Sequence, residues 1–558
     1  MLQTQQNFVD YLGQLDSLAK KARLDKDKSS FIASIKEREL LVPVVGGFSA
    51  GKSSALNAFL GEDILSVAIT PETALATELR YTDGESYAEG VKDNDSVEKI
   101  AIGALDSLKN RAGEFKYVKL YLNNPKLQQI APLILVDMPG FDAPLELHNK
   151  AIMEYLARGV YFVILESAES GTIAMSIKKH IDNLKTLGRD FSFCLSKVDL
   201  VEPSTLQSIK DKIATTLQAE FDYDKDIALL GEDENRSKVL QTIIEQIDAE
   251  SVFENLYLDT LQFDFVDTKG SLQTKINALK STKDEADEAI KELQKAIQII
   301  INKKQNIAQN TTSDIKSAVD GTMMAVDRAI EDSISSIAQS ALDNPQSINS
   351  QVNEIVRSTL LSEFTKRGSK IRENLISDYK LALKDLNVVS LEIDSSWVEN
   401  VVGAINTALH NISIGVKDNK ELVESVATLL DAGSTIVLGK NPNLYIQVAA
   451  IVAKIAASLL RAFGIKKEID EGKLLTDILQ GVRTTIMPEV STAYSNQISA
   501  MKEIVATLIE SKLKEKQDEI SKAQEEKSKI ADKLNAEIVD LSKIREALDS
   551  LATKYLYK

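Results

Sequence analysis

Residues 40–60 read LLVPVVGGFSAGKSSALNAFL, and this stretch decides the fold of the N-terminal half of the chain. Its first part, LLVPVV, is apolar and short enough to be a buried strand. Residues 46–53, GGFSAGKS, match the pattern GxxxxGK[ST], and the following SALNAFL has the composition of a helix. A buried strand, a glycine-rich turn and a helix in this order predict one unit of a parallel α/β sheet.

The glycine-rich turn predicts a site for phosphate groups. Its glycines let successive backbone N–H groups point into one concavity, and the positive end of the following helix adds to the attraction. Lys52 is expected to reach the β- and γ-phosphates of a nucleotide, and Ser53 to bind Mg²⁺. The other reading is an incidental glycine turn, which the flanking strand and helix argue against. Contacts to the nucleotide are expected from Gly46, Gly47, Phe48, Ser49, Ala50, Gly51, Lys52, Ser53 and Ser54.

A second strand end carries polar residues suited to the same nucleotide. LILVDMPG ends an apolar run with Asp137, which is expected to hold Mg²⁺ through water, and Gly140, whose N–H is expected to contact the γ-phosphate. Alone, this run also fits a strand end with an ordinary Pro-Gly turn. Between the two elements, ITPETALATELRY offers Thr70, Thr73 and Thr77 as a further Mg²⁺ ligand, and we choose Thr73.

A third strand end predicts which base is bound. FSFCLSKVD ends with Ser196, Lys197 and Asp199, all expected to contact the nucleotide. The Asp199 carboxylate can accept both N1–H and N2–H of guanine, whereas adenine offers no such pair of donors, so we expect GTP and GDP with Mg²⁺. Ser196 stands where such motifs usually have Asn or Thr. No second contact to the base stands out, and the stretch LLGEDENRS is only a place to look.

The 558 residues exceed the size of one hydrophobic core, so several domains are expected. Apolar runs such as ELLVPVV, YVKLYL, LILVDM, VYFVIL and FSFCLS predict a mostly parallel sheet with helices on both faces. The chain is divided as residues 1–38, one N-terminal helix; 39–250, the nucleotide domain; 251–394, a helical neck and trunk; 395–480, an apolar tip; and 481–558, helices returning to the trunk. The fold class is therefore an α/β P-loop domain joined to a long all-α domain.

Two stretches of apolar residues repeat every seven positions and predict long packed helices. One runs through Leu279, Ala286, Leu293, Ile300 and Ile307. The other runs through Leu534, Leu541, Leu548 and Tyr555. Such seams are typical of coiled-coil packing, so the two helices are expected to be partners in a bundle.

Charge and cysteine content exclude other classes. The net charge of -17 repels the phosphate backbone of nucleic acids, so no nucleic-acid partner is expected. Cys194 is the only cysteine, which rules out an intramolecular disulfide and is typical of a reducing cytoplasm. Asp10 and Asp16 interrupt the apolar pattern at the start, so no secretory signal is expected and the protein is predicted to stay in the cytoplasm.

Residues 432–467 contain no Asp or Glu and hold a candidate surface for membranes. Lys454 lies near the middle of the apolar run 444–467, which argues against a membrane span and favours an amphipathic tip on an anionic surface. The other reading is that the apolar face packs inside the helical bundle. The candidate membrane residues are Lys440, Val448, Ile451, Val452, Lys454, Ile455, Leu459, Arg461 and Phe463.

The stretch GGFSAGKSSALNAFLGEDIL resembles the first motif of dynamin-like proteins, which usually has Gln-Ser before Ala-Gly-Lys-Ser. With the DMPG and SKVD loops and the helical C-terminal half, the chain resembles bacterial dynamin-like proteins, in particular the LeoA type. The resemblance implies a GTPase head, a helical neck and trunk, a lipid-binding tip, and remodelling of membranes or vesicle-related transport. It also implies self-association through the heads or in larger assemblies, partner proteins of the same family, and a peripheral place on the membrane.

The resemblance assigns catalytic roles to Ser49, Lys52 and Thr73. It also reveals a departure, because Phe48 stands where the family commonly has a glutamine that positions the attacking water, and Phe141 is no substitute. Slow hydrolysis, or hydrolysis that needs groups from a second head, is therefore expected.

Two other functions fit parts of the sequence. A P-loop ATPase with coiled-coil arms would share the turn and the heptads, but SKVD and the lack of an LSGGQ-like sequence argue against it. A helical membrane-lytic protein with a non-catalytic nucleotide-binding head would use the acid-free stretch, and the three nucleotide motifs argue against it.

Overall fold

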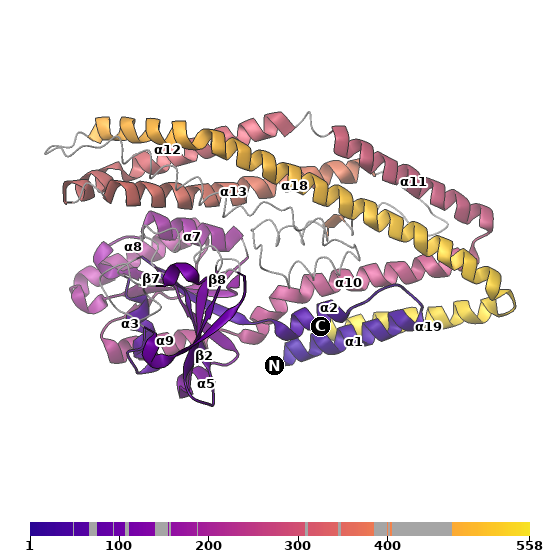
Figure 1. Cartoon of the computed structure of the whole chain (residues 1–558), viewed down its shortest axis with the longest axis horizontal. Coiled ribbons are helices and arrows are strands. Elements are labelled where there is room, and N and C mark those ends of the chain that lie inside the picture. The colour runs from indigo at the N-terminus through magenta and orange to yellow at the C-terminus, as the bar shows by residue number, and fades with distance from the viewer. Residues whose placement is uncertain are drawn as a thin grey trace.

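The structure is a computed structural model, in which the described residues are 1–47, 50–65, 75–92, 94–105, 111–139, 155, 158–186, 188–306, 311–343, 347–383, 399, 402–403 and 471–557. A sheet domain lies at one end, and long helices run away from it and return over it (Figure 1).

A mixed, mostly parallel sheet of nine strands forms the first domain, in the order β4-β3-β5-β2-β6-β1-β7-β8-β9. The strands are β1 (Leu40–Gly46), β2 (Thr77–Tyr81), β3 (Tyr87–Val91), β4 (Val97–Ala101), β5 (Tyr117–Leu122), β6 (Leu133–Asp137), β7 (Tyr161–Ser167), β8 (Asp190–Ser196) and β9 (Ala228–Leu230). β6, β1, β7, β8 and β9 pair in parallel, whereas β2 is antiparallel to β6, and β3 is antiparallel to β4 and β5. The predicted α/β fold class is confirmed, and all five predicted apolar runs lie in this sheet.

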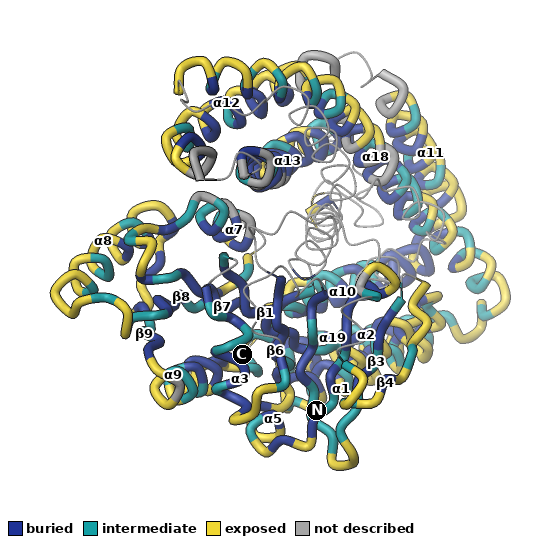
Figure 2. The backbone as a smooth tube through the Cα atoms, turned by 60° about the vertical axis from the view of Figure 1, so that its left-hand side comes forward, coloured by how far each residue is buried: buried dark blue, intermediate teal, exposed yellow. Residues whose placement is uncertain are grey.

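Helices cover both faces of the sheet (Figure 2). They are α3 (Lys52–Leu60), α5 (Pro125–Gln129), α7 (Met175–Thr186), α8 (Pro203–Phe221) and α9 (Asp233–Glu245). α3 packs against α5 and α9, and α7 packs against α8. Short 3-10 helices are η1 (Ile102–Ala104), η2 (Ala112–Glu114), η3 (Ala168–Ser170) and η4 (Val198–Leu200).

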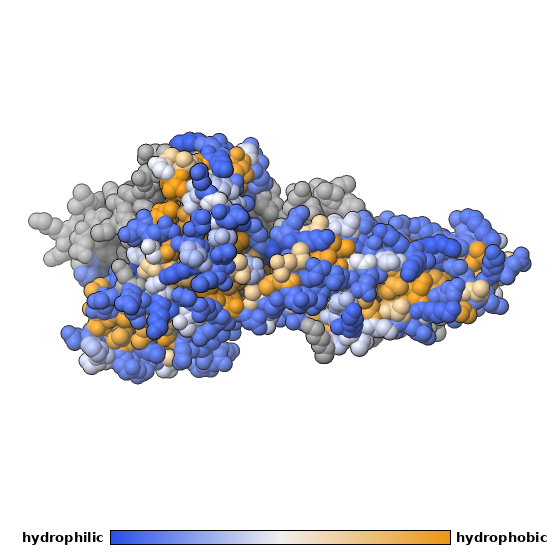
Figure 3. All heavy atoms as spheres, turned by 90° about the horizontal axis from the view of Figure 1, so that it is seen from below, coloured by the Kyte–Doolittle hydropathy of each residue, from blue (hydrophilic) through white to orange (hydrophobic). Residues whose placement is uncertain are grey.

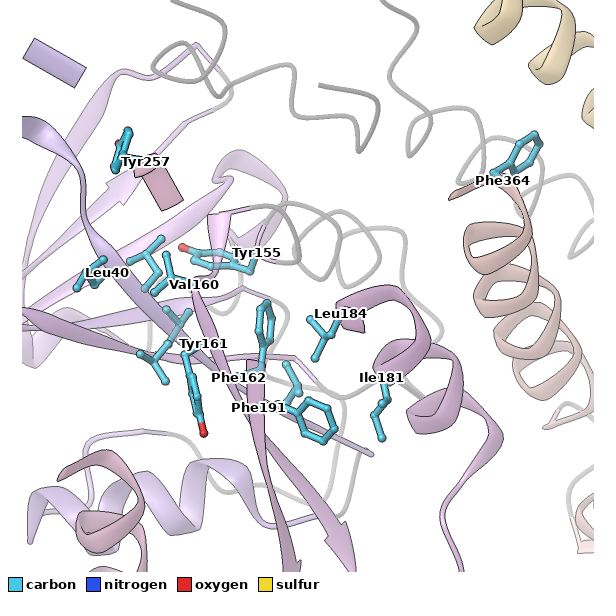
Figure 4. Packing of buried hydrophobic residues seen from close by; sticks show 14 of the residues in the cluster. Leu40, Tyr155, Val160, Tyr161, Phe162, Ile181, Leu184, Phe191, Tyr257 and Phe364 are labelled. Atoms are coloured by element: carbon cyan, nitrogen blue, oxygen red, sulfur yellow. The ribbon is translucent and has the colours of Figure 1, made fainter. Parts of the chain in front are cut away.

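The core between the sheet and α7 is built from large apolar side chains. Phe162 of β7 and Phe191 of β8 lie side by side and face Ile181 and Leu184 of α7, and all four are 2% exposed or less (Figure 4). Burying an apolar side chain of this size contributes roughly 1.5–3 kcal/mol. This packing holds the central parallel strands rigidly, and their carboxyl ends carry the candidate site.

The helical part consists of α1 (Gln3–Lys21), α2 (Ser29–Glu37), α10 (Ala249–Lys280), α11 (Lys283–Asn306), α12 (Thr311–Asp343), α13 (Ser347–Ala382), α18 (Glu471–Lys529), η6 (Ala531–Lys533) and α19 (Leu534–Tyr555). The sequence predicts one helix over residues 1–38, but the structure has two. The first ends where Arg23 takes a left-handed backbone conformation (φ 54°), which no helix can continue.

α1, α10 and α19 pack together next to the sheet domain, and α18 packs against α10, α11, α12 and α13. Tyr11 of α1 and Tyr555 of α19 have ring centroids 6.1 Å apart, and Gln14 Nε2 donates to the Tyr555 hydroxyl at 3.2 Å. The seam predicted over residues 279–307 is divided by the break between α10 and α11, and Ile307 lies outside the described residues. Ala286, Leu293 and Ile300 lie in α11, which packs mainly on α18, so the expected pairing of this seam with the C-terminal seam is wrong for α11; only the preceding α10 packs on α19.

α12 and α13 return over the sheet domain, where α13 packs on α7 (Figure 1). The Ser362 hydroxyl donates to Asp182 Oδ2 at 2.9 Å across this contact. α18 begins at Glu471, inside the range 395–480 that the sequence assigns to the tip. From below, the helical part shows mainly hydrophilic side chains with narrow bands of hydrophobic residues (Figure 3). Within the described ranges, no helix combines the length and the apolar character needed to cross a bilayer.

Candidate functional site

The glycine-rich turn connects β1 to α3. Gly46 ends β1, and a Cβ there would lie 2.3 Å from the carbonyl oxygen of Leu165 on β7, so any larger residue would push the two strands apart. Gly51 precedes α3 with φ at +78°, a left-handed conformation that glycine adopts at little cost. Both glycines are therefore required by the backbone path between strand and helix.

Lys52 is held over the turn. It begins α3, is 5% exposed, and its Nζ donates to the carbonyl oxygens of Gly46 at 3.1 Å and Gly47 at 2.8 Å. The ammonium group is thus localised at the mouth of the turn. A phosphate oxygen placed there would meet a fixed positive charge and the N-terminal end of α3.

Ser53 and Asp137 join the turn to the second strand end. The Ser53 hydroxyl donates to Asp137 Oδ2 at 2.7 Å, and Asp137 is 1% exposed at the end of β6. Burial raises the pKa of Asp137 to about 6, although the hydrogen bond from Ser53 and the charge of Lys52 act in the opposite direction. Asp137 Oδ1 makes no hydrogen bond to any described residue. A hydroxyl beside a carboxylate with a free buried oxygen is a donor set that fits Mg²⁺.

The third strand end presents Asp199. β8 ends at Ser196, whose hydroxyl donates to the carbonyl oxygen of Glu166 at 3.3 Å, and Asp199 follows in η4. Lys197 has a left-handed backbone (φ 56°), and its Nζ lies 2.9 Å from Glu169 Oε2. The sequence does not single out Glu169, because its proximity to Lys197 depends on the pairing of β7 with β8.

The loop after β9 lies beside Asp199. A Cβ on Gly231 would be 3.8 Å from Asp199 Oδ1 and 3.4 Å from Val198 Cγ2, and the Gly231 N–H donates to Asn235 Oδ1 at 2.8 Å. This loop belongs to LLGEDENRS, which the sequence marks only as a place to look. β9 is only three residues long, so the sequence does not reveal it as a strand. Without this strand, the sequence cannot predict that the following loop lies beside Asp199.

The sheet brings these groups to one edge. β1, β6 and β8 run in parallel within the order β6-β1-β7-β8, so their carboxyl ends meet at the same side. Ligands of open α/β sheets bind at this side. Ala50 lies within the turn and is 3% exposed, and Ser54 lies in α3. Thr77 lies in β2, opposite Asp137 in the β2–β6 ladder.

Other predicted residues lie outside the described part of the chain. They are Phe48, Ser49, Thr70, Thr73, Gly140 and Phe141 of the nucleotide site and Lys440, Val448, Ile451, Val452, Lys454, Ile455, Leu459, Arg461 and Phe463 of the candidate membrane surface.

Comparisons with known proteins agree with this geometry. Residues 42–198 match the model of the dynamin family. A protein of Campylobacter jejuni named "Dynamin-like protein 2" is 25% identical over 193 residues, which is 33% of this chain and 30% of that protein. An uncharacterised protein of Caldicellulosiruptor is 20% identical over 207 residues, covering 36% of this chain and 51% of that protein. The chain therefore spans about a third and about half of the lengths of these two relatives.

Solved structures to which the chain is similar include one of an oligomerised bacterial dynamin pair and the LeoA bacterial dynamin GTPase from ETEC. The first is 15% identical with a TM-score of 0.35 and covers 96% of this chain and 95% of its own. The second is 13% identical with a TM-score of 0.31 and covers 99% and 98%. The family match over residues 42–198, which contain Lys52, Ser53 and Asp137, shows that the chain carries a dynamin-family domain and is similar to bacterial dynamin-like proteins.

Proposed function

We propose that this protein is a GTPase that binds GTP together with Mg²⁺ and hydrolyses it to GDP and phosphate. The proposal rests most directly on the Ser53–Asp137 pair, in whose buried carboxylate one oxygen accepts no hydrogen bond from the described part of the chain. Lys52 and the N-terminus of α3 supply the positive charge that phosphate groups need.

The reaction is an attack of water on the γ-phosphorus, in which the bond to the bridging oxygen of GDP breaks. Lys52 would neutralise charge on the β- and γ-phosphates, and Ser53 and Asp137 would hold the cation. When bound, Mg²⁺ supplies charge that stabilises the departing diphosphate. We further propose Thr73 as the third protein group of the cation site and Ser49 as a contact to the transferring phosphate.

The base is proposed to be guanine. Asp199 offers two carboxylate oxygens to N1–H and N2–H, and Lys197 and the loop from Gly231 to Asn235 stand beside it. In a P-loop ATPase, a carboxylate at this position would find no matching pair of N–H donors on adenine. Equal affinity for ATP and GTP would therefore move the assignment to the ATPase class.

The direct test is calorimetric titration of the whole chain with GTP and with ATP, in Mg²⁺ and in EDTA. Binding of GTP is expected to be tighter than binding of ATP, and Lys52→Ala is expected to abolish it. Lys178→Ala is the matched control, because Lys178 pairs with Glu220 on the outside of the same domain at 2.7 Å. Unchanged GTP binding by Lys52→Ala would contradict the proposed site.

We propose a low basal turnover that rises with protein concentration, because Phe48 and Phe141 cannot position water and a second head would have to supply that group. Phe48→Gln is expected to raise the basal rate. Turnover that is fast and independent of concentration in the wild type would contradict this part of the proposal.

Membrane contact and self-association are the remaining parts of the proposal. The acid-free stretch 432–467 supports a cytoplasmic protein that binds peripherally to anionic membranes. Assembled there, the GTPase would remodel lipid or take part in vesicle-related transport. Partner proteins of the dynamin-like family would join such assemblies. The test is flotation with anionic vesicles of the wild type beside Ile451→Asp/Ile455→Asp. A folded double variant that floats as well as wild type would exclude this stretch as the anchor.

A further inference from the structure

Glu78 is a fully buried carboxylate on β2, the strand that pairs with β6, which ends at Asp137. It lies on β2 with 0% of its surface exposed, and its neighbour Thr77 stands opposite Asp137 in the β2–β6 ladder. Glu78 itself stands opposite Val136. A buried charge is costly unless it is paired and hydrogen-bonded, so the partners of Glu78 show what it holds.

Both oxygens of this carboxylate accept two hydrogen bonds. Oε1 accepts from the Tyr155 hydroxyl at 2.7 Å and from Arg158 Nη2 at 3.1 Å. Oε2 accepts from Arg80, through Nε at 2.9 Å and Nη2 at 2.5 Å. The Glu78 carboxylate thus accepts four hydrogen bonds, two from Arg80 on the same strand and two from Tyr155 and Arg158.

Tyr155 and Arg158 lie where the chain that leaves Asp137 returns to the sheet. β6 ends at Asp137, and β7 begins at Tyr161. The Val160 N–H donates to the carbonyl oxygen of Leu41 at 2.9 Å, which fixes the returning chain on β1. Glu78 thus contacts both sides of this connection. Its backbone pairs with Val136 at the end of β6, and its carboxylate binds Tyr155 and Arg158 before β7.

The partners of Glu78 are themselves held. The Arg158 guanidinium lies over the rings of Tyr117 and Tyr155, at 4.7 and 5.0 Å from their centroids. Arg80 donates to both oxygens of Glu39, at 2.6 and 2.7 Å, at the start of β1. Supporting contacts of this kind lock a side chain in one position, which is what a precise site requires.

We propose that Glu78 is a positioning residue that acts through Asp137: it fixes both ends of the connection around the proposed cation ligand and so sets the affinity for Mg²⁺ in the nucleotide complex. The inference rests on the proposed GTPase function. It goes beyond it by assigning a role to a residue outside the three nucleotide motifs.

The experiment measures the affinity for fluorescent GDP in EDTA, the Mg²⁺ concentration that gives half of the Mg²⁺-dependent gain in GTP affinity, and kcat and KM for GTP. The variants of the whole chain are Glu78→Gln, Arg158→Met, Arg158→Lys and Tyr155→Phe. Arg111→Met is the matched control, because Arg111 pairs with Glu98 and Glu114 at the β4 edge and is 37% exposed there.

For Glu78→Gln we expect the Mg²⁺ midpoint to rise about three- to tenfold, while the GDP affinity in EDTA stays within about twofold of wild type. kcat should fall more than KM changes. Arg158→Lys keeps a positive charge and should lie closer to wild type than Arg158→Met. If Glu78→Gln does not fold, Tyr155→Phe decides, because it removes one hydroxyl and should still raise the midpoint about twofold.

Folded variants with the midpoint of wild type would overturn the inference and reduce Glu78 to a structural residue, even if their melting temperatures fall. A rise of equal size in Arg111→Met would overturn it as well. Failure of the wild type to bind GTP in Mg²⁺ is a different result, since it would overturn the proposed function and the inference together.

Discussion

The burial of Asp137 disfavours the ionised carboxylate that the proposed cation site needs. Its burial raises the pKa to about 6, so at neutral pH the free protein holds an ionised carboxylate in a place that disfavours the charge. A cation with two positive charges would remove that penalty. Asp137 therefore costs stability in the free protein, and the proposed cation would offset that cost.

Replacing Asp137 by Asn tests this conflict. The folded-state pKa is raised above the usual value of 3.8, so the contribution of Asp137 to stability is fully present below about pH 4 and is lost as pH rises through about 6. Asp137→Asn has no ionisation to suppress, and we expect it to stabilise the nucleotide-free protein by about 3 kcal/mol at pH 7. Thermal unfolding at several pH values measures this. The gain should shrink towards pH 4, and Mg²⁺-dependent GTP binding should be lost.

Asp199 predicts a separate effect on base choice. Removal of two hydrogen bonds to a charged group should weaken GTP binding by about ten- to a hundredfold in Asp199→Ala and leave ATP binding unchanged. Competition titrations against a fluorescent nucleotide measure both affinities. Asp211→Ala, on the outside of α8, is the control that should behave as wild type. An equal loss for GTP and ATP would show that Asp199 shapes the loop and does not contact the base.

At the scale of the element, the residues 22–28 between α1 and α2 bring charges into the helical part. Lys26 is buried, with its Nζ 2.7 Å from Asp267 of α10, and Lys512 of α18 lies 3.0 Å from the same carboxylate oxygen. Burial alone would raise the pKa of Asp267, but Lys26, Lys512 and Lys516 outweigh it and hold the pKa well below its usual range. Asp267 thus joins three parts of the chain.

Asp267→Asn should therefore destabilise the helical part by about 3 kcal/mol at pH 7, because it leaves buried lysines with one counter-charge fewer. The lowered pKa means that this contribution is present above the usual carboxyl pKa of about 4 and is lost below it, so the difference from wild type should narrow in acid. Urea unfolding followed by helical circular dichroism measures it. Asp540→Asn, which breaks an exposed pair with Lys543, should cost less than about 0.5 kcal/mol.

The strands differ in how well their sequences predict them. β1, β6, β7 and β8 are continuous apolar runs because both faces are buried, and the sequence predicts them directly. β2, β3 and β4 read TELRY, YAEGV and VEKIA, whose charged residues are typical of loops or surface strands. Glu78 is the clearest case, because only the arginines and the tyrosine brought by the fold make its burial possible.

The motifs of the site belong to the predictable part, since the turn, Asp137 and Asp199 each follow an apolar run at a fixed spacing. Glu169 and Gly231 do not, because their proximity to Lys197 and Asp199 is created by strand pairing. Similarly, the break in the predicted helix over residues 1–38 depends on charged residues that find partners far away in the sequence.

At the scale of the whole molecule, α13 rests on α7 of the sheet domain, and the contact buries polar groups. His180 and Arg357 are 5% and 3% exposed, and burial together with the charge of Arg357 lowers the pKa of His180 to about 3. His180 is thus neutral throughout the physiological range. Two facing helices with buried polar side chains form a contact that is sensitive to added charge.

Asp182→Arg should open this contact, because it replaces the acceptor of Ser362 by a larger side chain with a positive charge. We expect a larger radius of gyration in small-angle X-ray scattering and faster hydrogen exchange in α7. Lys185→Gln, an exposed position on the same helix, is the control that should leave both unchanged. A variant with the scattering curve of wild type would show that α13 stays on α7 without this hydrogen bond.

The pairing of α1 with α19 has a consequence for synthesis of the chain. Gln14 and Tyr555 are 541 residues apart, and a ribosome adding about 5–20 residues per second needs roughly half a minute to two minutes to make that length. Through this time α1 lacks its contact with α19, although its other two partners, α2 and α10, are made earlier. The face of α1 that packs on α19 is therefore uncovered throughout this interval, and the interval lengthens wherever translation slows.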